Sequence, residues 1–478
     1  MGARVLLVGL DGLEPAVADR MVNARRLPVL ARLMAEGCAG RLQSTFPANS
    51  APAWTSCRTG VNPGKHGAFG FWRRSGYEWP LVSSADIGAA TLEQILSRRG
   101  RRVCSLNVPL TFPPRPVNGV MVTGLPTPGM RSDFTFPAAV ADHLRTRIPD
   151  YQADGFGDLD TLDAGHLSAQ LARRHAARRD AALWLLGQEQ WDLFMVVFTL
   201  ADKVQHMLWG ETEARETEGA PGGEPGAAVE AAYETLDATL GRLLEATGSE
   251  TTVIVMSDHG FGPCRHLFHV NVWLREHGFL RLHRGHKLRV RRLRRPARGW
   301  RPRVELGPPR LRVDWRRTRA FGGLYVECPG LWLNIKGREP DGVITTGTEQ
   351  RDLSVRLADD LLACRDDEGS PLLRAVVPRD DIYAGLHAAG APDMLLMPHD
   401  EGIRLMGQFT IRSSLEATAN SVENRGSHRP VGVLYARGPG CGALREACVS
   451  IMDVAPTVLH ALDEAVPRYM DGRSMFAE

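Results

Sequence analysis

The sequence predicts an α/β fold in which a mostly parallel central sheet lies between two layers of helices. Strands buried on both faces read as continuous apolar runs, and helices between them return the chain for the next parallel strand. With 478 residues, 43% of them hydrophobic, the chain has enough apolar material for a large core. Runs rich in Val, Ile and Leu alternate with helical patterns at residues 5–10, 103–108, 193–200, 252–256 and 432–436.

The segment LPVLARLMAEG, which follows the first of these runs, illustrates the helical pattern. Pro28 suits the first turn of a helix and Gly37 suits its end. The even alternation of strands and helices favours one large domain, 1–478, over several separate ones. Two stretches interrupt it and are predicted to be insertions that form a cap: residues 131–190, mostly helical, and residues 277–319, which contain a strongly basic run.

Composition narrows the class of protein. The eight cysteines are scattered and form no CxxC pair, so we expect reduced thiols that pack in the interior. The apolar run at residues 5–10 is far shorter than the roughly 18 residues that span a bilayer, and no small-residue cleavage site follows it. The sequence therefore predicts a cytoplasmic protein without a membrane span.

Acidic and imidazole side chains follow three of the predicted strands. Asp11 follows the first, Asp202 and His206 follow the third, and Asp258 and His259 follow the fourth. A single Asp after a strand often just caps a helix, but ligands of α/β proteins bind at the carboxyl ends of the strands. Asp and His are donors for Zn²⁺, and the i, i+4 spacing of Asp202 and His206 puts both on one helical face.

A serine precedes a predicted helix in the segment STFPANSAPAWTSCRTG. Pro52 suits the first turn of that helix and Gly60 its end, so Ser50 lies at or near the N-cap. Most serines in that place only cap the helix. The alternative is a nucleophile whose hydroxyl is activated by a metal while the helix N-terminus holds a phosphate group.

These motifs together resemble the type I phosphodiesterase/nucleotide pyrophosphatase family of the alkaline phosphatase superfamily. The resemblance extends over most of the chain and implies an alkaline phosphatase-like three-layer α/β/α sandwich. It is carried by GLDG at the start, PAWTSxxTGxNPGKHG at 52–67, DKVQH at 202–206, SDHGFGP at 257–263, GSHRPVG at 426–432 and DVAPTVLHAL at 453–462.

The family pattern implies a site with two divalent metal ions. The nucleophile of related enzymes stands nine residues before the Thr of the TG pair, which is Thr59 here and gives Ser50. Mixed Asp and His donors favour zinc, with manganese and iron as the alternatives. The first metal would be bound by Asp11, Ser50, Asp258 and His259, and the second by Asp202, His206 and His428.

Two positions depart from related patterns. Many relatives have an Asn about twenty residues past the nucleophile that donates to a phosphoryl oxygen, and Phe71 stands there in this chain. Asn62, Lys65 and an Arg from an insertion are the candidates to replace that contact, and His66 is predicted either to touch substrate or to hold its turn. Trp54 stands where sulfatases carry an Arg, which argues against sulfate hydrolysis.

The resemblance implies hydrolysis of phosphodiester or pyrophosphate bonds through a phospho-serine intermediate, on a small substrate such as a nucleotide. The alternative enzyme is a phosphomonoesterase or phosphotransferase with the same metals. A rival class, a nucleic-acid-binding protein without catalysis, rests on residues 281–303, which hold eleven Arg or Lys and no acid. Such a run is usually a solvated face, and few aromatic residues lie within it for base stacking.

Two further histidines, His266 and His269, compete with His428 for the second metal. We expect both to be structural: His266 to line a loop, and His269 to begin the alternating segment FHVNVWL and face the sheet.

Overall fold

The computed structural model of the chain describes residues 3–153, 164–188, 190–218, 224–283, 313–323, 327–408, 413–417, 426–439 and 441–476. Its centre is a nine-stranded sheet with the strand order β18-β2-β17-β7-β1-β6-β3-β4-β5. The strands are β1 (Arg4–Leu10), β2 (Cys38–Gln43), β3 (Val103–Val108), β4 (Gly119–Thr123), β5 (Thr135–Phe136), β6 (Leu193–Phe198), β7 (Thr251–Met256), β17 (Val431–Arg437) and β18 (Cys448–Ser450).

The sheet is parallel at its centre. β1 lies between β6 and β7 and is parallel to both, and β3 is parallel to β6 and β4. Two strands of this sheet are antiparallel to their neighbours: β17 to both β7 and β2, and β5 to β4. The predicted mostly parallel sheet is confirmed, while the run at 432–436 belongs to an antiparallel strand that apolar composition alone does not distinguish.

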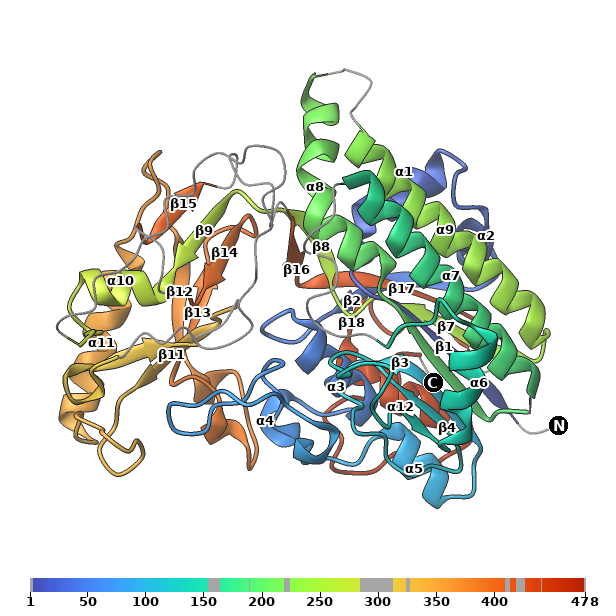
Figure 1. Ribbon diagram of the computed structural model, residues 1–478, viewed down its shortest axis with the longest axis horizontal. Helices are drawn as coiled ribbons and strands as arrows, with labels where there is room; N and C mark the ends of the chain where they lie inside the picture. The colour runs from blue at the N-terminus through green and yellow to red at the C-terminus, as the bar shows by residue number, and fades with distance from the viewer. Residues whose placement is uncertain are drawn as a thin grey trace.

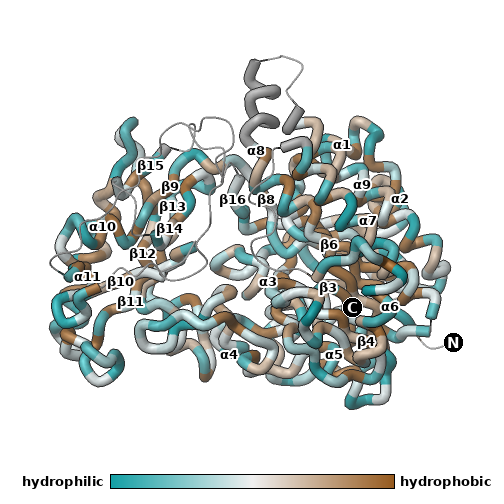
Figure 2. The backbone as a smooth tube through the Cα atoms, viewed as in Figure 1, coloured by the Kyte–Doolittle hydropathy of each residue, from teal (hydrophilic) through white to brown (hydrophobic). Residues whose placement is uncertain are grey.

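Both faces of the sheet are covered by helices. Alternate residues of a strand point to opposite faces, and accordingly Leu6 and Val8 of β1 enter one core while Val5 and Leu7 enter the other. Figure 1 shows the resulting layers, and Figure 2 shows that β3 and β6 are among the most apolar segments. One face carries α1 (Pro15–Asn23), α2 (Pro28–Glu36), α6 (Ala139–Arg147), α7 (Ala164–Gln188), α8 (Leu200–Glu218) and α9 (Glu224–Thr247). The other carries α3 (Ser50–Thr59), α5 (Leu92–Arg98) and α12 (Val454–Ala461).

A second lobe is inserted between two short strands that pair with each other, β8 (Gly260–Pro263) and β16 (Gly426–Arg429). It has its own hydrophobic core and appears on the left of Figure 1. The lobe contains a four-stranded sheet of β10 (Ala320–Gly322), β11 (Gly330–Leu333), β13 (Met394–Pro398) and β12 (Leu373–Pro378), and a three-stranded sheet of β14 (Ile403–Met406), β9 (His266–His269) and β15 (Leu415–Ala417). Two helices complete it, α10 (Val270–Glu276) and α11 (Thr348–Leu362).

The two stretches predicted as insertions lie in different places. Residues 131–190 include α6 and α7, and α7 packs against β6 and α9 as part of a helical layer. Residues 277–319 belong to the second lobe. Of the basic segment 281–303, all but the first three residues lie outside the described residues.

The segment FHVNVWL is not the alternating strand that the sequence suggested. It ends strand β9 at His269 and continues as helix α10, in which five consecutive residues are buried. Burial on all sides removes the polar–apolar contrast from which the helical period could be recognised. No helix in the described part of the chain combines the length and apolar character needed to cross a bilayer.

Candidate active site

Three strand ends bring the predicted acidic ligands to one edge of the sheet. Asp11 follows β1, Asp202 lies in the first turn of α8 after β6, and Asp258 follows β7. These strands are parallel neighbours, so their carboxyl ends meet at the same edge. The backbone links two of them directly, because Asp202 N donates to Asp11 O at 3.2 Å.

Ser50 is the first residue of α3, and Asn49 rather than Ser50 is the N-cap. The Asn49 side-chain oxygen accepts from Ala51 N at 3.1 Å. The Ser50 hydroxyl is therefore not used to cap the helix. Its Oγ lies 3.4 Å from Asp11 Oδ1 and 3.3 Å from His259 Nε2, so the structure brings the serine to the acidic edge of the sheet.

Asp11, Asp258 and His259 form one buried group of possible metal ligands. One donor atom from each lies within 4.8 Å of the others. His259 Nε2 is 3.6 Å from Asp11 Oδ1 and 3.4 Å from Asp258 Oδ2. These three residues are the ones predicted, with Ser50, to hold the first metal, and their donor atoms converge as such a site requires.

The second group of converging donors is Asp202, His259 and His428, so His259 belongs to both groups. His206, the other predicted ligand of the second metal, lies beside this group. His206 and His428 face each other with their Nε2 atoms 2.9 Å apart. Asp202 Oδ1 lies 3.2 Å from the first and 3.4 Å from the second. The two groups adjoin, because the rings of His259 and His428 stack with centroids 3.8 Å apart.

The histidines hold the tautomer that a metal ligand needs. His428 Nδ1 donates to the carbonyl oxygen of Ala48 at 2.8 Å, and His259 Nδ1 donates to its neighbour Gly260 at 3.0 Å. A ring nitrogen that donates in this way leaves the other nitrogen unprotonated as a ligand atom. In both residues that atom is the Nε2 facing the acidic groups.

Electrostatics at this edge favour a cation. Burial, together with the negative charge of Asp202, raises the pKa of Asp11 to about 7. Burial and the charges of Asp11 and Asp202 raise the pKa of Asp258 well above its usual range. Burial lowers the pKa of His259 to about 3, which keeps its ring neutral. Several carboxylates are thus crowded around the neutral ring of His259.

A buried oxygen atom of Asp258 also favours a bound cation at this place. Asp258 Oδ2 is fully buried and has no hydrogen-bond donor among the described residues. A buried polar atom without a partner costs free energy, and a divalent cation would satisfy it. Donor type, convergence and charge all fit a site for divalent metal ions.

Trp54 is a residue of this site that the sequence prediction did not include as a contributor. It is fully buried, and its indole nitrogen donates to Asp11 Oδ2 at 3.0 Å. The ring packs against Gly9, where an added Cβ would approach it to 2.1 Å. One feature of the sequence indicated that Trp54 lies near the site. It stands four residues after Ser50, which places its indole one turn along the same helix.

The tentative substrate residues Asn62, Lys65 and His66 surround the short helix α4 (Pro63–His66). Asn62 caps it and donates to Asp471, and Lys65 pairs with the same carboxylate. His66 is buried between Ser56 Oγ and the amide of Ala68. These contacts give the three side chains a structural role, and a contact with substrate stays a prediction.

Phe71 lies in a small hydrophobic cluster with Ala51, the residue after the serine. Its side chain therefore packs behind the start of α3, and the structure gives it an apolar environment. A contact between Phe71 and substrate also stays a prediction.

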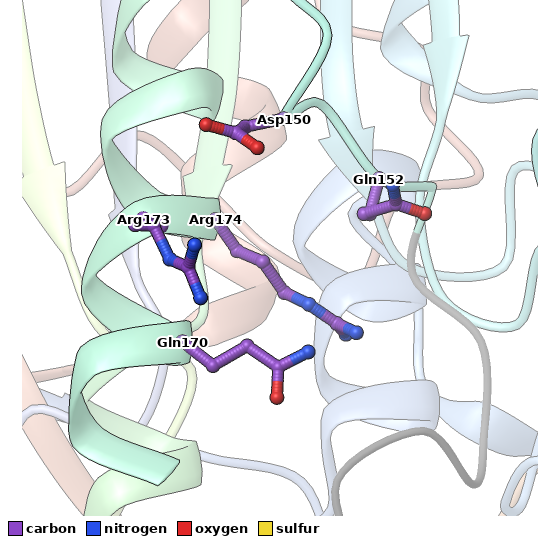
Figure 3. Close-up of a pocket in the computed structure, with 5 residues that line it drawn as sticks. All are labelled: Asp150, Gln152, Gln170, Arg173 and Arg174. Carbon is purple, nitrogen blue, oxygen red and sulfur yellow. The ribbon is translucent and has the colours of Figure 1, made fainter. Parts of the chain in front are cut away.

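The competing histidines lie in the second lobe. His266 begins β9, and His269 ends it and is buried with its Nε2 3.4 Å from Glu416 Oε2. Neither belongs to the two groups of converging donors. A polar cavity of about 270 Å³ lies elsewhere, between α7 and the loop after α6 (Figure 3). It is lined by Asp150, Gln152, Gln170, Arg173 and Arg174, none of them a predicted ligand.

Comparison with solved structures shows the same fold. Phosphonoacetate hydrolase from Sinorhizobium meliloti 1021, in complex with phosphonoacetate, matches with a TM-score of 0.59 and 18% identity, covering 97% of this chain and 96% of that one. Human ectonucleotide pyrophosphatase/phosphodiesterase 5 matches with a TM-score of 0.53 and 13% identity, covering 98% and 97%. The murine counterpart, in an inactive form in complex with AMP, gives 0.54 at 13% identity, covering 98% and 97%.

No curated protein sequence matches the chain significantly. The sequence model of one family, type I phosphodiesterase / nucleotide pyrophosphatase, matches residues 5–429, which include all seven predicted metal ligands. The chain is a hydrolytic enzyme and belongs to the type I phosphodiesterase / nucleotide pyrophosphatase family.

Proposed function

We propose that this enzyme hydrolyses phosphodiester or pyrophosphate bonds with two divalent metal ions and forms a phospho-serine intermediate on Ser50. The observation that carries the proposal is the position of the Ser50 hydroxyl. Its Oγ lies within 3.4 Å of both Asp11 Oδ1 and His259 Nε2, and it is free of the capping role that Asn49 fills.

The first metal ion would be held by Asp11, Ser50, Asp258 and His259, and the second by Asp202, His206 and His428. Zinc is proposed because the donors are carboxylates and imidazoles, and manganese and iron accept the same set. Bound there, the two ions would lower the pKa of the attacking groups and neutralise charge on the phosphoryl oxygens.

The residues of the chain supply orientation and charge. Ser50 gives up its hydroxyl proton to solvent as its Oγ attacks phosphorus, the bond to the leaving oxygen breaks and that oxygen takes up a proton, and the phosphoryl group is carried on the serine. Water then loses a proton and attacks the phospho-serine from the side of Asp202, His206 and His428, the bond between phosphorus and Oγ breaks, and Oγ takes up a proton to restore the hydroxyl. Ser50 is the first residue of α3, so the positive dipole end of this helix would favour the negative charge of a phosphoryl group at Ser50.

The proposed substrate is a small phosphorylated molecule such as a nucleotide or nucleotide conjugate. Support comes from the family to which the chain belongs and from a structural neighbour that is described with AMP.

The test compares nitrophenyl phosphate, bis-nitrophenyl phosphate and a nitrophenyl nucleotide ester on zinc-loaded protein. The proposal expects faster turnover of the two diesters, loss of turnover on chelation and its return on adding zinc. Ser50→Ala should bind zinc and fail to form a phosphorylated protein. Preference for the monoester would overturn the diester assignment, and full turnover by Ser50→Ala would overturn the serine route.

A further inference from the structure

The side chain of Asn49, directly before Ser50, is held at both of its ends. Its oxygen accepts from Ala51 N at 3.1 Å and so caps α3, and its Nδ2 donates to Glu327 Oε2 at 2.6 Å. A carboxamide has two N–H groups on its nitrogen. Among the described residues, Glu327 is the partner that Nδ2 has, so one N–H group remains for a ligand.

Glu327 reaches Asn49 from the second lobe. Its backbone forms a bridge with Met406 at the end of β14, and its other carboxylate oxygen accepts from Arg404 of the same strand at 3.0 Å. The Arg404 side chain is only 10% exposed. The carboxylate is therefore fixed on one side by the guanidinium and on the other by the amide.

The chain on either side of Asn49 contributes to the proposed metal site. Ser50 adjoins it on one side in the chain, and on the other side Ala48 accepts the hydrogen bond from His428. The hydrogen bond from Asn49 therefore links Glu327 of the second lobe to the segment that carries Ser50.

We propose that Asn49 is a catalytic residue whose amide N–H donates to a non-bridging phosphoryl oxygen, and that Glu327, itself held by Arg404, is the positioning residue for that amide. The inference rests on the proposed function of Ser50. It assigns a polar donor to the reacting phosphoryl group at a site where the side chain at position 71 is apolar.

The charges and the geometry of Asn49, Glu327 and Arg404 both suit a bound phosphoryl group. Glu327 alone would repel a phosphate, and its ion pair with Arg404 makes the two together neutral. The carboxylate fixes which way the amide faces, because the capping oxygen must point at Ala51 N and the nitrogen at Glu327. A donor fixed in this way needs no reorientation when charge develops on the phosphoryl oxygens.

The decisive comparison is between Asn49→Ser and Asn49→Ala in the zinc-loaded full chain. Serine is as good an N-cap as asparagine and alanine is not, so only the alanine variant should lose the cap. Neither variant carries the amide donor. We expect kcat on bis-nitrophenyl phosphate to fall about 10²–10³-fold in both, the usual effect of removing one such donor, with wild-type zinc content and with a lower melting temperature in the alanine variant alone.

Wild-type kcat in Asn49→Ser would overturn the proposal, because it would mean that Asn49 serves only as a cap. Loss of zinc from Asn49→Ser would overturn it too, because the residue would then act through the metals. Glu327→Gln retains an acceptor for the amide but loses the ion pair, and we expect a fall of about 10-fold in kcat with unchanged zinc content. An unchanged kcat there would remove Glu327 from the proposal.

Asp400→Asn is the matched control, since it also neutralises an acid of the second lobe that pairs with an arginine, Arg265, away from Asn49. Its kcat should be that of the wild type. Binding of inorganic phosphate, measured by calorimetry, separates the two proposals. If the wild type hydrolyses no phosphoester, the proposed function fails, and weaker phosphate binding by Asn49→Ser still tests the amide contact by itself.

Discussion

The indole nitrogen of Trp54 donates a 3.0 Å hydrogen bond to Asp11 Oδ2, while the other oxygen of the same carboxylate faces Ser50 and His259. One side chain of α3 thus fixes the rotation of a carboxylate at the end of β1. Outer hydrogen bonds of this kind orient metal ligands and tune their affinity. The nucleophile and the residue that orients its neighbouring ligand lie one turn apart on one helix.

Trp54→Phe should weaken metal binding more than it weakens the fold. Phenylalanine retains an aromatic ring against Gly9 but has no N–H for Asp11. We expect zinc affinity to fall about 10–100-fold, measured by competition with a chromophoric chelator.

The matched control is Trp191→Phe. Trp191 is also buried and donates its indole N–H, in this case to Leu185 O at 2.9 Å. It therefore suffers the same loss of ring volume and hydrogen bond away from the metal ligands. Equal zinc affinities in the two variants would contradict the role assigned to Trp54.

Asp258→Asn should stabilise the metal-free protein while it removes a metal ligand. Asp258 Oδ2 is buried without a donor, and Asp11 and Asp202 repel a charge at this position. A neutral amide of the same shape removes that cost, which we expect to be about 1–3 kcal/mol. The measurement is the melting temperature in excess chelator, together with zinc content after reconstitution. A lower melting temperature in chelator would show that the crowded carboxylates are not a source of instability.

His66 should make the stability of the protein depend on pH. Burial lowers its pKa to about 3, and its Nδ1 accepts a hydrogen bond from Ala68 N, which requires the neutral ring. Above about pH 6.5 the ring is neutral in both the folded and the unfolded chain. Below that pH the unfolded chain binds a proton that the folded one does not, so stability falls by about 1.4 kcal/mol per pH unit down to about pH 3.

The raised pKa values of Asp11 and Asp258 act in the opposite direction in the metal-free protein, so the His66 contribution is measured by comparing the change in urea midpoint from pH 7 to pH 5 in the wild type and in His66→Asn. His66→Asn should have a lower midpoint than the wild type at pH 7, because hydrogen bonds and packing are lost. Between pH 7 and pH 5 the free energy of unfolding of His66→Asn should fall less than that of the wild type, by about 2 kcal/mol. Equal changes in the two proteins would mean that the folded chain accepts the proton on His66.

Gly260→Ala should disturb the site by sterics alone. An added Cβ would approach Val431 O to 2.3 Å and Glu14 Oε2 to 2.6 Å, and the backbone there is not in the left-handed region. We expect a destabilisation of about 1–3 kcal/mol and reduced zinc content, because His259 precedes this residue. Gly187→Ala in α7 is the control. Its Cβ would meet nothing within 4 Å, and alanine favours a helix.

The reason for a glycine at position 260 could not be predicted from the neighbouring residues. Gly260 directly follows the bend that Asp258 and His259 form after β7. A glycine beside a bend suggests an irregular loop, but the reason for glycine at this place is different. Two segments far along the chain, β17 and the residues before α1, approach its backbone closely. A close approach between distant segments leaves no pattern in the neighbouring residues.

The sequence by itself determined the parallel centre of the sheet, the strand ends that carry Asp11, Asp202 and Asp258, and the start of the helix at Ser50. These follow from short-range rules, since apolar runs define buried strands and proline and glycine bound helices. Only the tertiary structure decided that Trp54 orients Asp11 and that Glu327 reaches Asn49 from the second lobe. Those contacts join residues 43 and 278 positions apart, and a side-chain hydrogen bond across such a distance depends on packing that no local pattern encodes.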